Sequence, residues 1–305
     1  MVIINYVFMC MIFGTTFLAI KIGVDSGLPP FLSGGIRFFI AGFLLFVIML
    51  VKEKNIMCLL VRKELFLSGV GLTFGTFATL YWAEQYVTSG IAAVLSATGP
   101  MLIIVIQSII LRHKVRRTSI VGCVIGVIGV FFLILPSFSL EVNSYWIIGC
   151  FAIILGEVFY ASGTIYTKSV SKNFEGIHPV VLNAVQMMYG GILLFILGLL
   201  TEEISVQTII QPASLFSLFY LIVIGSMVGH SLFYWLVVKT DPVFPSTWLY
   251  ISPFIAVVVG VLFYDEFFSW LTGVGAVTIC IGMILINYET LKERVIAQRS
   301  KYIKV

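Results

Sequence analysis

The residues best suited to chemistry in this chain are a few ionisable side chains within long apolar segments. Glu157 is the one acid near the middle of such a segment, within Gly156–Tyr160. A carboxyl inside a membrane is costly, so its presence marks a functional candidate. It can exchange protons or bind a substrate ammonium group; the alternative is a structural hydrogen bond to a neighbouring helix.

Four further ionisable residues lie in or near the ends of apolar segments. His230 is the one histidine inside a segment, where it can relay protons near neutral pH or simply pack in the core. Lys21, Arg37 and Glu84 fall toward the same end of the first three segments. They can form one ion-paired cluster, or the cations can extend to the membrane surface. Lys21 is also a candidate for binding a substrate carboxylate.

Aromatic residues with a polar atom recur around these positions. They are candidates for the walls of a binding cavity, with interfacial belts and core packing as the alternative. These residues are Tyr81, Trp82, Tyr160, Tyr234, Trp235, Trp248 and Tyr250. The predicted substrate-binding residues are Glu157, Tyr160, Lys21, Tyr81, Trp82, His230, Tyr234 and Trp248.

The composition is that of a membrane protein. Hydrophobic residues make up 60% of the 305 positions, charged residues 10%, and the mean hydropathy is +1.11. A water-soluble domain carries far more charge, so we expect a polytopic membrane protein in contact with the lipid bilayer. The five cysteines are scattered without a CxxC spacing, and no metal, disulfide or cofactor is expected. The apolar start of the chain predicts a retained first helix rather than a removed signal peptide.

Ten apolar segments are long enough to cross about 30 Å of hydrocarbon. In the first half they are Ile3–Ile22, Pro30–Val51, Glu64–Val87, Ser89–Leu111 and Thr118–Leu135. In the second half they are Tyr145–Lys168, Pro179–Leu200, Leu215–Val238, Pro242–Tyr264 and Trp270–Tyr288.

The basic residues determine the predicted orientation. With the N-terminus in the cytoplasm, 16 of the 18 Lys and Arg residues fall in inner loops or in the C-terminal tail, and the other two are Lys21 and Arg37. Positive charge accumulates on the cytoplasmic side of membrane proteins, so both termini are predicted inside. The same asymmetry explains the net charge of +4 without a nucleic-acid partner.

Several residues recur at a fixed offset of 153 positions. Tyr81-Trp82 returns as Tyr234-Trp235, Pro100 as Pro253, Gly122 as Gly275 and Gly129 as Gly282. Five spans in each half is an odd number, so the second copy must be inverted in the membrane. We therefore predict one five-helix repeat over residues 1–140, a second inverted repeat over 141–288, and a basic cytoplasmic tail over 289–305.

The two repeated prolines predict where the chain bends. Pro100 and Pro253 lie near the centres of their segments, and a proline inside a helix removes one backbone hydrogen bond. In a membrane the freed carbonyl must be satisfied by protein or water, so such breaks belong beside a cavity. We interpret both prolines as hinges around a substrate cavity between the halves.

The order of short motifs resembles that of the EamA-type members of the drug/metabolite transporter superfamily, which are ten-helix metabolite exporters. Phe13–Lys21 is similar to the family's W-G-x-x-F-x-x-x-K, and Pro30 followed by Arg37 to its P-x6-R. Ser252–Glu266 resembles the family's proline helix that ends in an acid, and Gly275–Gly282 its closing G-x6-G. The resemblance extends over about residues 5 to 288. It implies that helices one, three, four, six, eight and nine line the cavity.

The chain departs from the family pattern at two places. Phe13 replaces the usual tryptophan, and Arg112-His113 stands where the fourth helix often ends in Gly-Glu. His113 is the repeat mate of Glu266, so an acid that is present in the second half is missing from the first. This difference argues against a gate shared symmetrically by both halves.

These observations predict a secondary transporter of the plasma (inner) membrane. Its substrates are predicted to be amino acids or related small metabolites, exported by alternating access, with proton coupling through Glu157 as one mode. A sugar or sugar-phosphate carrier is the alternative substrate class. An intramembrane lipid-modifying enzyme is the other alternative, but the chain has no HExxH or GxSxG motif, so no catalytic residues are predicted.

Overall fold

A computed structural model describes residues 1–53, 56–110, 112, 117–135, 143–252, 255, 269–271, 273–282, 284–286 and 288. All regular structure in these residues is helical. Seven helical runs among them are long and apolar enough to cross a membrane, and Arg117–Gly129 and Gly273–Ile286 are shorter apolar helices. The prediction of an all-helical membrane protein is confirmed. About half of the ninth predicted segment, including Pro253, and the tail lie outside the described residues, so the count of ten stays a prediction.

Each predicted segment of the first half coincides with a helix or a helical run. These are α1 (Val2–Asp25); α2 (Pro30–Lys52); α3 (Lys63–Gly69) with η2 (Val70–Gly75) and α4 (Thr76–Ala83); α5 (Ser89–Ser96) with α6 (Gly99–Ile110); and α7 (Arg117–Ile134). A short 3-10 helix, η1 (Ile56–Val61), precedes α3. Pro30 occupies the first turn of α2, where a missing N–H costs nothing. Thr88 caps α5 by accepting a hydrogen bond from the Ile91 amide at 3.4 Å.

The second half follows the same plan. Its elements are α8 (Ser144–Val170) with η4 (Ser171–Phe174); α9 (Pro179–Thr201); α10 (Val206–Ile209); α11 (Pro212–Tyr220) with η5 (Leu221–His230) and α12 (Ser231–Lys239); and α13 (Val243–Ser246). Asn143 caps α8 by accepting a hydrogen bond from the Trp146 amide at 2.8 Å. Pro179 starts α9 as Pro30 starts α2.

Irregular backbone recurs at matching places in the two halves. The third and eighth spans contain the π-helical segments η2 and η5, which overlap when the offset of 153 is applied. Such turns are frequent at functional sites. Gly27 (φ 84°) and Gly176 (φ 91°) adopt the left-handed conformation shortly before α2 and α9, which glycine does at little cost.

The fourth span is interrupted next to Pro100, as predicted. α5 ends at Ser96 and α6 begins at Gly99. Proline cannot donate to the helical ladder, and its ring crowds the preceding turn. The helix is therefore interrupted in the middle of the span, while the role of Pro100 as a hinge stays a prediction.

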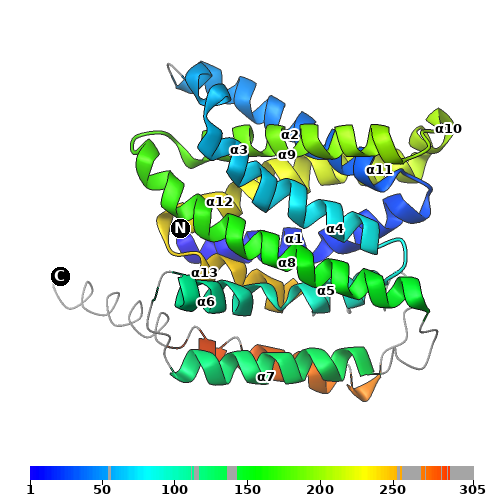
Figure 1. Cartoon of the computed structure of the whole chain (residues 1–305), viewed down its shortest axis with the longest axis vertical. Coiled ribbons are helices and arrows are strands. Elements are labelled where there is room, and N and C mark those ends of the chain that lie inside the picture. Colours follow the sequence, from blue (N-terminus) through cyan, green and yellow to red (C-terminus); the bar gives the residue numbers. More distant parts are fainter. Residues whose placement is uncertain are drawn as a thin grey trace.

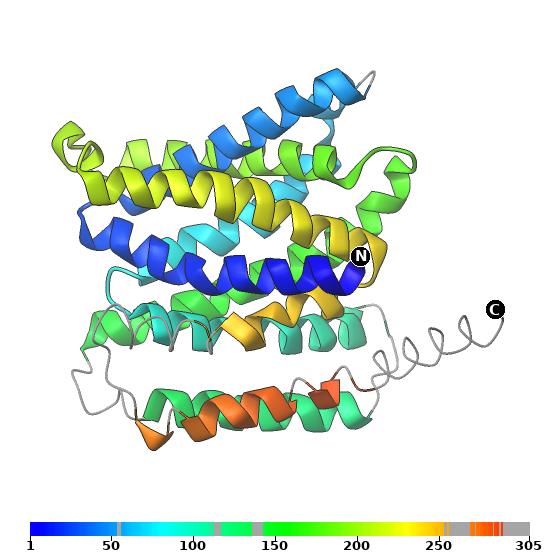
Figure 2. The same ribbon diagram turned by 180° about the vertical axis from the view of Figure 1, so that it is seen from behind.

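The spans lie roughly parallel in two layers, with α4 and α8 in front in Figure 1 and α1 and α12 in front in Figure 2. α2 and α9 pack together at one end of the molecule, and α7 packs against the helix Gly273–Ile286 at the other. The remaining spans lie between these two pairs. Each end thus consists of equivalent helices from the two halves.

Backbone contacts at the α7 end occur in pairs related by the repeat. A Cβ atom on Gly122 would lie 2.7 Å from the Gly282 carbonyl oxygen, and one on Gly129 would lie 2.8 Å from that of Gly275. Because Gly275 and Gly282 are the repeat mates of Gly122 and Gly129, each contact copies the other with the chain order reversed. Antiparallel pairing of equivalent helices is the arrangement that an inverted repeat produces.

Carboxylates pair the ends of α2 and α9 reciprocally. Glu202, after α9, accepts hydrogen bonds from the Phe31 and Leu32 amides at 2.7 and 2.9 Å, at the start of α2. Glu53, after α2, accepts one from the His178 amide at 3.2 Å, at the start of α9. A carboxylate there satisfies free amides and complements the helix dipole. The acid that follows each helix therefore caps the N-terminus of the equivalent helix in the other half.

Candidate functional site

A small cavity lies between the two halves. Its volume is about 40 Å³, and a water molecule needs on the order of 10–15 Å³ of such volume. This conformation therefore holds a few waters and has no room for a metabolite. Of the predicted site residues, Glu157, Tyr160, His230 and Trp248 line this cavity, and Arg37 joins them.

Glu157 faces the break in the fourth span. The residue is 5% exposed, and any side chain at Gly99 would collide with its Oε2 atom. Oε2 has no hydrogen-bond partner, and the Ser96 hydroxyl lies beside the carboxyl. The carboxyl is thus buried beside the interruption between α5 and α6, and one of its oxygens makes no hydrogen bond.

Tyr160 and Trp248 connect α8 to the start of the ninth segment. The Tyr160 hydroxyl donates to Ser246 Oγ at 3.0 Å and accepts from Trp248 Nε1–H at 3.2 Å. The Trp248 ring packs against Phe13, with 4.5 Å between centroids. These contacts give the cavity an aromatic wall contributed by three different spans.

Arg37 is a buried cation in the cavity lining. Its Nε–H donates to Ser226 Oγ at 2.8 Å, and Nη1 donates to the Tyr81 hydroxyl at 3.2 Å. The guanidinium lies over the rings of Phe38 and Phe77, at 4.5 and 5.2 Å. Among the described residues no carboxylate lies within 4.0 Å of it. Arg37 is buried and does not extend to the surface. It makes no direct ion pair among these residues, but the buried Glu84 carboxyl lies near enough to interact with the charges of Arg37 and Lys21.

The repeat mate of Arg37 makes an equivalent contact with a shorter side chain. The spacing from Pro30 to Pro179 pairs Arg37 with Gln186, and Thr73 Oγ1 donates to Gln186 Oε1 at 2.8 Å, as Arg37 donates to Ser226. Tyr234, the mate of Tyr81, is fully buried, and its hydroxyl has no hydrogen-bond partner. Glutamine is too short to make the second contact that arginine makes.

His230 lies among aromatic rings. Its ring is 5.0 Å from Phe13, 5.3 Å from Phe38 and 5.4 Å from Phe77, with edge-to-face geometry. It sits in the π-helical segment η5, and Phe77 is its repeat mate. Its surroundings are those of a packed histidine beside the buried charge of Arg37.

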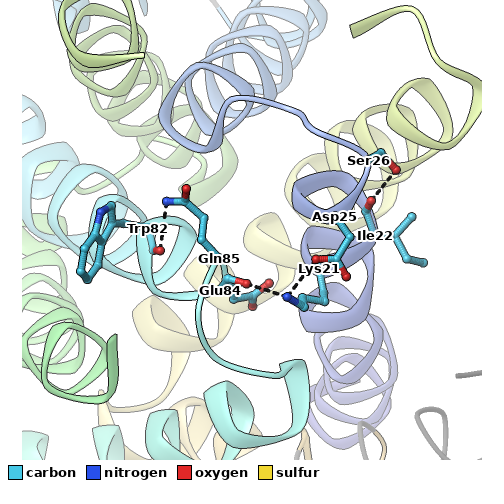
Figure 3. A network of polar contacts seen from close by, with 7 residues as sticks. All are labelled: Lys21, Ile22, Asp25, Ser26, Trp82, Glu84 and Gln85. Carbon is cyan, nitrogen blue, oxygen red and sulfur yellow. Dashed lines mark hydrogen bonds and ion pairs between the residues drawn. The ribbon is translucent and has the colours of Figure 1, made fainter. Parts of the chain in front are cut away.

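Lys21 lies near the C-terminal end of α1 and is not among the residues that line the cavity; Figure 3 shows its contacts with Asp25 and Glu84. Its Nζ donates to the Glu84 backbone carbonyl at 2.9 Å and pairs with Asp25 at 2.9 Å. The two oxygens of the buried Glu84 carboxyl have no hydrogen-bond partner. Lys168 lies near the end of α8, as Lys21 lies near the end of α1, and likewise donates to the Val238 and Thr240 carbonyls at the end of α12. This shared position identifies the two lysines as repeat mates, at the offset 168 − 21 = 147 that applies to the first helix of each half. Both lysines cap a helix C-terminus, a structural role.

Three other predicted site residues are placed differently. Trp82 packs on Tyr86 and lines a separate outer pocket with Asp25 and Glu202. Tyr81 reaches the site only through Arg37, and Tyr234 lies in the core outside the cavity lining. These positions leave their substrate-binding roles as predictions.

Arg37 is the functional candidate that sequence reasoning left out of the site. A signal was present, because Arg37 shares a helical face with the small residues Ser33, Gly34 and Ala41. Small residues in membrane helices mark faces that pack closely on other helices. A cation on such a face points into the protein and away from lipid.

Comparisons with known proteins agree on a family and a fold. The profile of the EamA-like transporter family matches residues 1–135 and 147–288. The chain is 26% identical to the protein named "Uncharacterized inner membrane transporter YedA" of Escherichia coli K12, over 90% of this chain and 87% of that protein. It is 24% identical to "Uncharacterized transporter YoaV" of Bacillus subtilis, over 96% and 99%, and 26% identical to "Protein PecM" of Dickeya dadantii, over 93% and 91%. One solved crystal structure superposes with a TM-score of 0.74 at 15% identity, over 96% of this chain and 97% of that chain.

Proposed function

Because the chain belongs to the EamA-like transporter family, we propose that it exports amino acids or related small zwitterionic metabolites as a secondary transporter. It is a multi-pass membrane transporter of the inner membrane, like the relatives whose names say so. Export, the substrate class and the energy source are the proposed parts.

Two buried groups of opposite character in one cavity carry the proposal. Arg37 supplies a fixed positive charge with no carboxylate within 4.0 Å among the described residues, and Glu157 supplies a carboxyl with one oxygen that makes no hydrogen bond. A zwitterion presents a carboxylate and an ammonium, which are the complements of these groups. The aromatic wall around them suits an apolar side chain and can also attract an ammonium group.

The size of the cavity requires that the protein opens to load its substrate. At about 40 Å³ the cavity is closed around a few waters. The break at Pro100 and the π-helical segments η2 and η5 lie on spans that line it. Interrupted helices at the midplane are the elements that secondary transporters move to open one side at a time.

A sugar-phosphate carrier is less well supported as a substrate class. A phosphate monoester carries up to two negative charges and is usually met by several cations. Within the described lining Arg37 is the one cationic side chain. Glu157 beside it would repel such a substrate whenever the carboxyl is ionised.

Counterflow in proteoliposomes tests the substrate class directly. Purified protein is reconstituted with a lumenal pool of neutral amino acids, sugars or sugar phosphates, and entry of the matching radiolabelled compound is followed. We expect counterflow with one or more amino acids and none with sugars or sugar phosphates. Counterflow with a sugar phosphate alone would contradict the proposal.

A further inference from the structure

One face of α8 carries polar side chains from the cavity to the end of the helix, and Ser171 at the start of η4 continues it. Glu157, Tyr160, Thr164, Thr167 and Ser171 follow one another at intervals of three and four residues, which places them on one helical face. All five are buried, and Thr164 and Thr167 are 0% exposed. Hydroxyl groups buried this deeply are costly unless they are hydrogen-bonded.

Several of these groups lack a sufficient protein partner. No hydrogen bond of ordinary geometry is made by Glu157 Oε2, Thr164 Oγ1 or the Tyr234 hydroxyl. Thr164 does lie beside the Tyr160 hydroxyl, and Tyr234 lies beside Thr167. Thr167 Oγ1 reaches Ser68 Oγ only at 3.5 Å. Buried polar atoms in this condition are usually satisfied by ordered water. Ordered water between these hydroxyls would supply the hydrogen bonds that the protein does not.

The line connects two cavities. At one end Glu157 and Tyr160 line the central cavity. At the other end Ser171 lines a pocket of about 260 Å³ together with Lys168 and Lys172. The charge distribution puts this lysine-rich end in the cytoplasm. Water at Ser171 is thus cytoplasmic water.

The equivalent face of the first half is apolar. The spacing from Lys21 to Lys168 matches the five polar positions with other residues of α1. These mates are Cys10, Phe13, Phe17, Ile20 and Val24. The polar line is therefore not a by-product of the duplicated scaffold. It exists in one half, and α1 offers no matching route toward the outer face.

We propose that this face of α8 is the path by which Glu157 exchanges protons with the cytoplasm. The proposal deepens the proton coupling in the proposed function and rests on it. A proton leaves the Glu157 carboxyl and turns it into a carboxylate. Each hydroxyl or water accepts a proton on its oxygen and passes its own onward, so one proton is released to water beside Ser171.

Other titratable groups around Glu157 do not offer this route. Arg37 on α2 and His230 in η5 line the same cavity but lie on spans other than α8. Tyr234 of α12 faces the line itself, beside Thr167. The path therefore depends on Thr164 and Thr167, the two hydroxyls between the cavity and the cytoplasmic end.

The test follows the protonation of Glu157 without any substrate. A hydrophobic carbodiimide modifies the protonated carboxyl, and labelling of Glu157 is quantified by mass spectrometry. Inside-out and right-side-out membrane vesicles holding the full-length protein receive a jump in bath pH while the lumen stays buffered. Wild-type labelling should follow bath pH promptly in inside-out vesicles and lag in right-side-out ones.

The double variant Thr164→Val/Thr167→Val keeps the side-chain shape and removes both hydroxyls. We expect the inside-out response to slow by about tenfold or more, because the positioned proton carriers are lost. Thr164→Ser/Thr167→Ser restores the hydroxyls and should restore the rate. Ser214→Ala removes another buried, unpartnered hydroxyl, away from the line, and should change nothing.

Three results would overturn the proposal. They are an unchanged response in the valine variant, wild-type labelling that follows the outer pH, and absence of Glu157 labelling at every pH. Because the measurement uses no substrate, it stands apart from the search for one. A protein that fails every counterflow assay can still show the cytoplasmic response, and the reverse also holds.

Discussion

The networks around Arg37 and around Gln186 occupy equivalent places in the two halves but differ in reach and charge. Arg37 contacts both Ser226 and Tyr81, whereas Gln186 contacts Thr73 and leaves the Tyr234 hydroxyl without a partner. The two networks join equivalent pairs of spans, α2 with η5 and α9 with η2, so the backbone arrangement is the same in both halves. A repeat can therefore retain its packing while the chemistry of one half changes.

The difference has a consequence for the kind of substrate that fits. A cavity formed by two identical halves would present the same groups in pairs, either two cations or two amides. Here Arg37 comes from the first half and Glu157 from the second, and the mates of these residues are Gln186 and Cys10. A cavity with two unlike poles suits a molecule with two unlike ends.

Replacing Arg37 by the residue of its mate should have the largest effect. Arg37→Gln removes the cation of the described lining and the donor to Tyr81. We expect counterflow kcat/KM to fall by about 100-fold, because losing one partner of a buried charge pair costs about 2–5 kcal/mol. Arg37→Lys keeps the charge but loses the planar guanidinium group, so its kcat/KM should lie between those of the wild type and Arg37→Gln. Wild-type kcat/KM in a stably folded Arg37→Gln protein would contradict this role.

Glu157→Gln should separate driven transport from exchange. Glutamine keeps the size and most of the hydrogen bonds of the carboxyl but cannot give up a proton. Accumulation driven by a pH gradient should drop to the equilibrium level, while counterflow should fall by no more than about tenfold, since a neutral hydrogen bond remains. Cys10→Ala, at the mate position, should leave both unchanged. Gradient-driven accumulation that persists in Glu157→Gln would leave the carboxyl as a structural group.

The sequence predicted the features that are set by local chemistry. Hydropathy placed the spans, the proline predicted the break between α5 and α6, and Tyr-Trp and glycine spacings revealed the repeat. It could not predict which way each helix turns about its axis, because lipid and protein interior are equally apolar and the hydrophobic pattern is weak. The sequence therefore could not show that Trp82 lines a separate pocket and that Lys21 caps α4, rather than lining the central cavity.

The close contact between α7 and the helix Gly273–Ile286 gives a smaller effect, on stability. Gly122→Ala would press a methyl group against the Gly282 carbonyl, which we expect to cost about 1–3 kcal/mol of unfolding free energy. Gly126→Ala is the matched control, since its Cβ would meet only Tyr250 at 3.7 Å. Gly129→Ala, against Gly275, should cost as much as Gly122→Ala. Thermal unfolding in detergent measures all three variants. A large difference between Gly122→Ala and Gly129→Ala would contradict the prediction that the two contacts are equivalent.

The reciprocal caps of α2 and α9 give the smallest effect and test whether the two faces are equally secured. Glu202→Ala frees two amides at the start of α2 and should cost about 1 kcal/mol of unfolding free energy. Glu53→Ala frees one amide held at 3.2 Å and should cost less than Glu202→Ala. The outer end of the pair is thus expected to be the more firmly held. Equal costs in thermal unfolding would remove that difference.

The pH dependence of the Glu202 cap follows from its burial. Burial raises the pKa of Glu202, and the hydrogen bonds from the Phe31 and Leu32 amides offset this only in part. The folded protein therefore binds the proton more tightly than the unfolded chain, so this group's contribution is fully present at low pH. It is lost as the pH rises from the ordinary glutamate value through the folded pKa. Glu202→Gln lacks this titration, so the Tm of the wild type minus that of the Gln variant should decrease over that range. A difference in Tm that grows with pH would mean that the two amides outweigh burial.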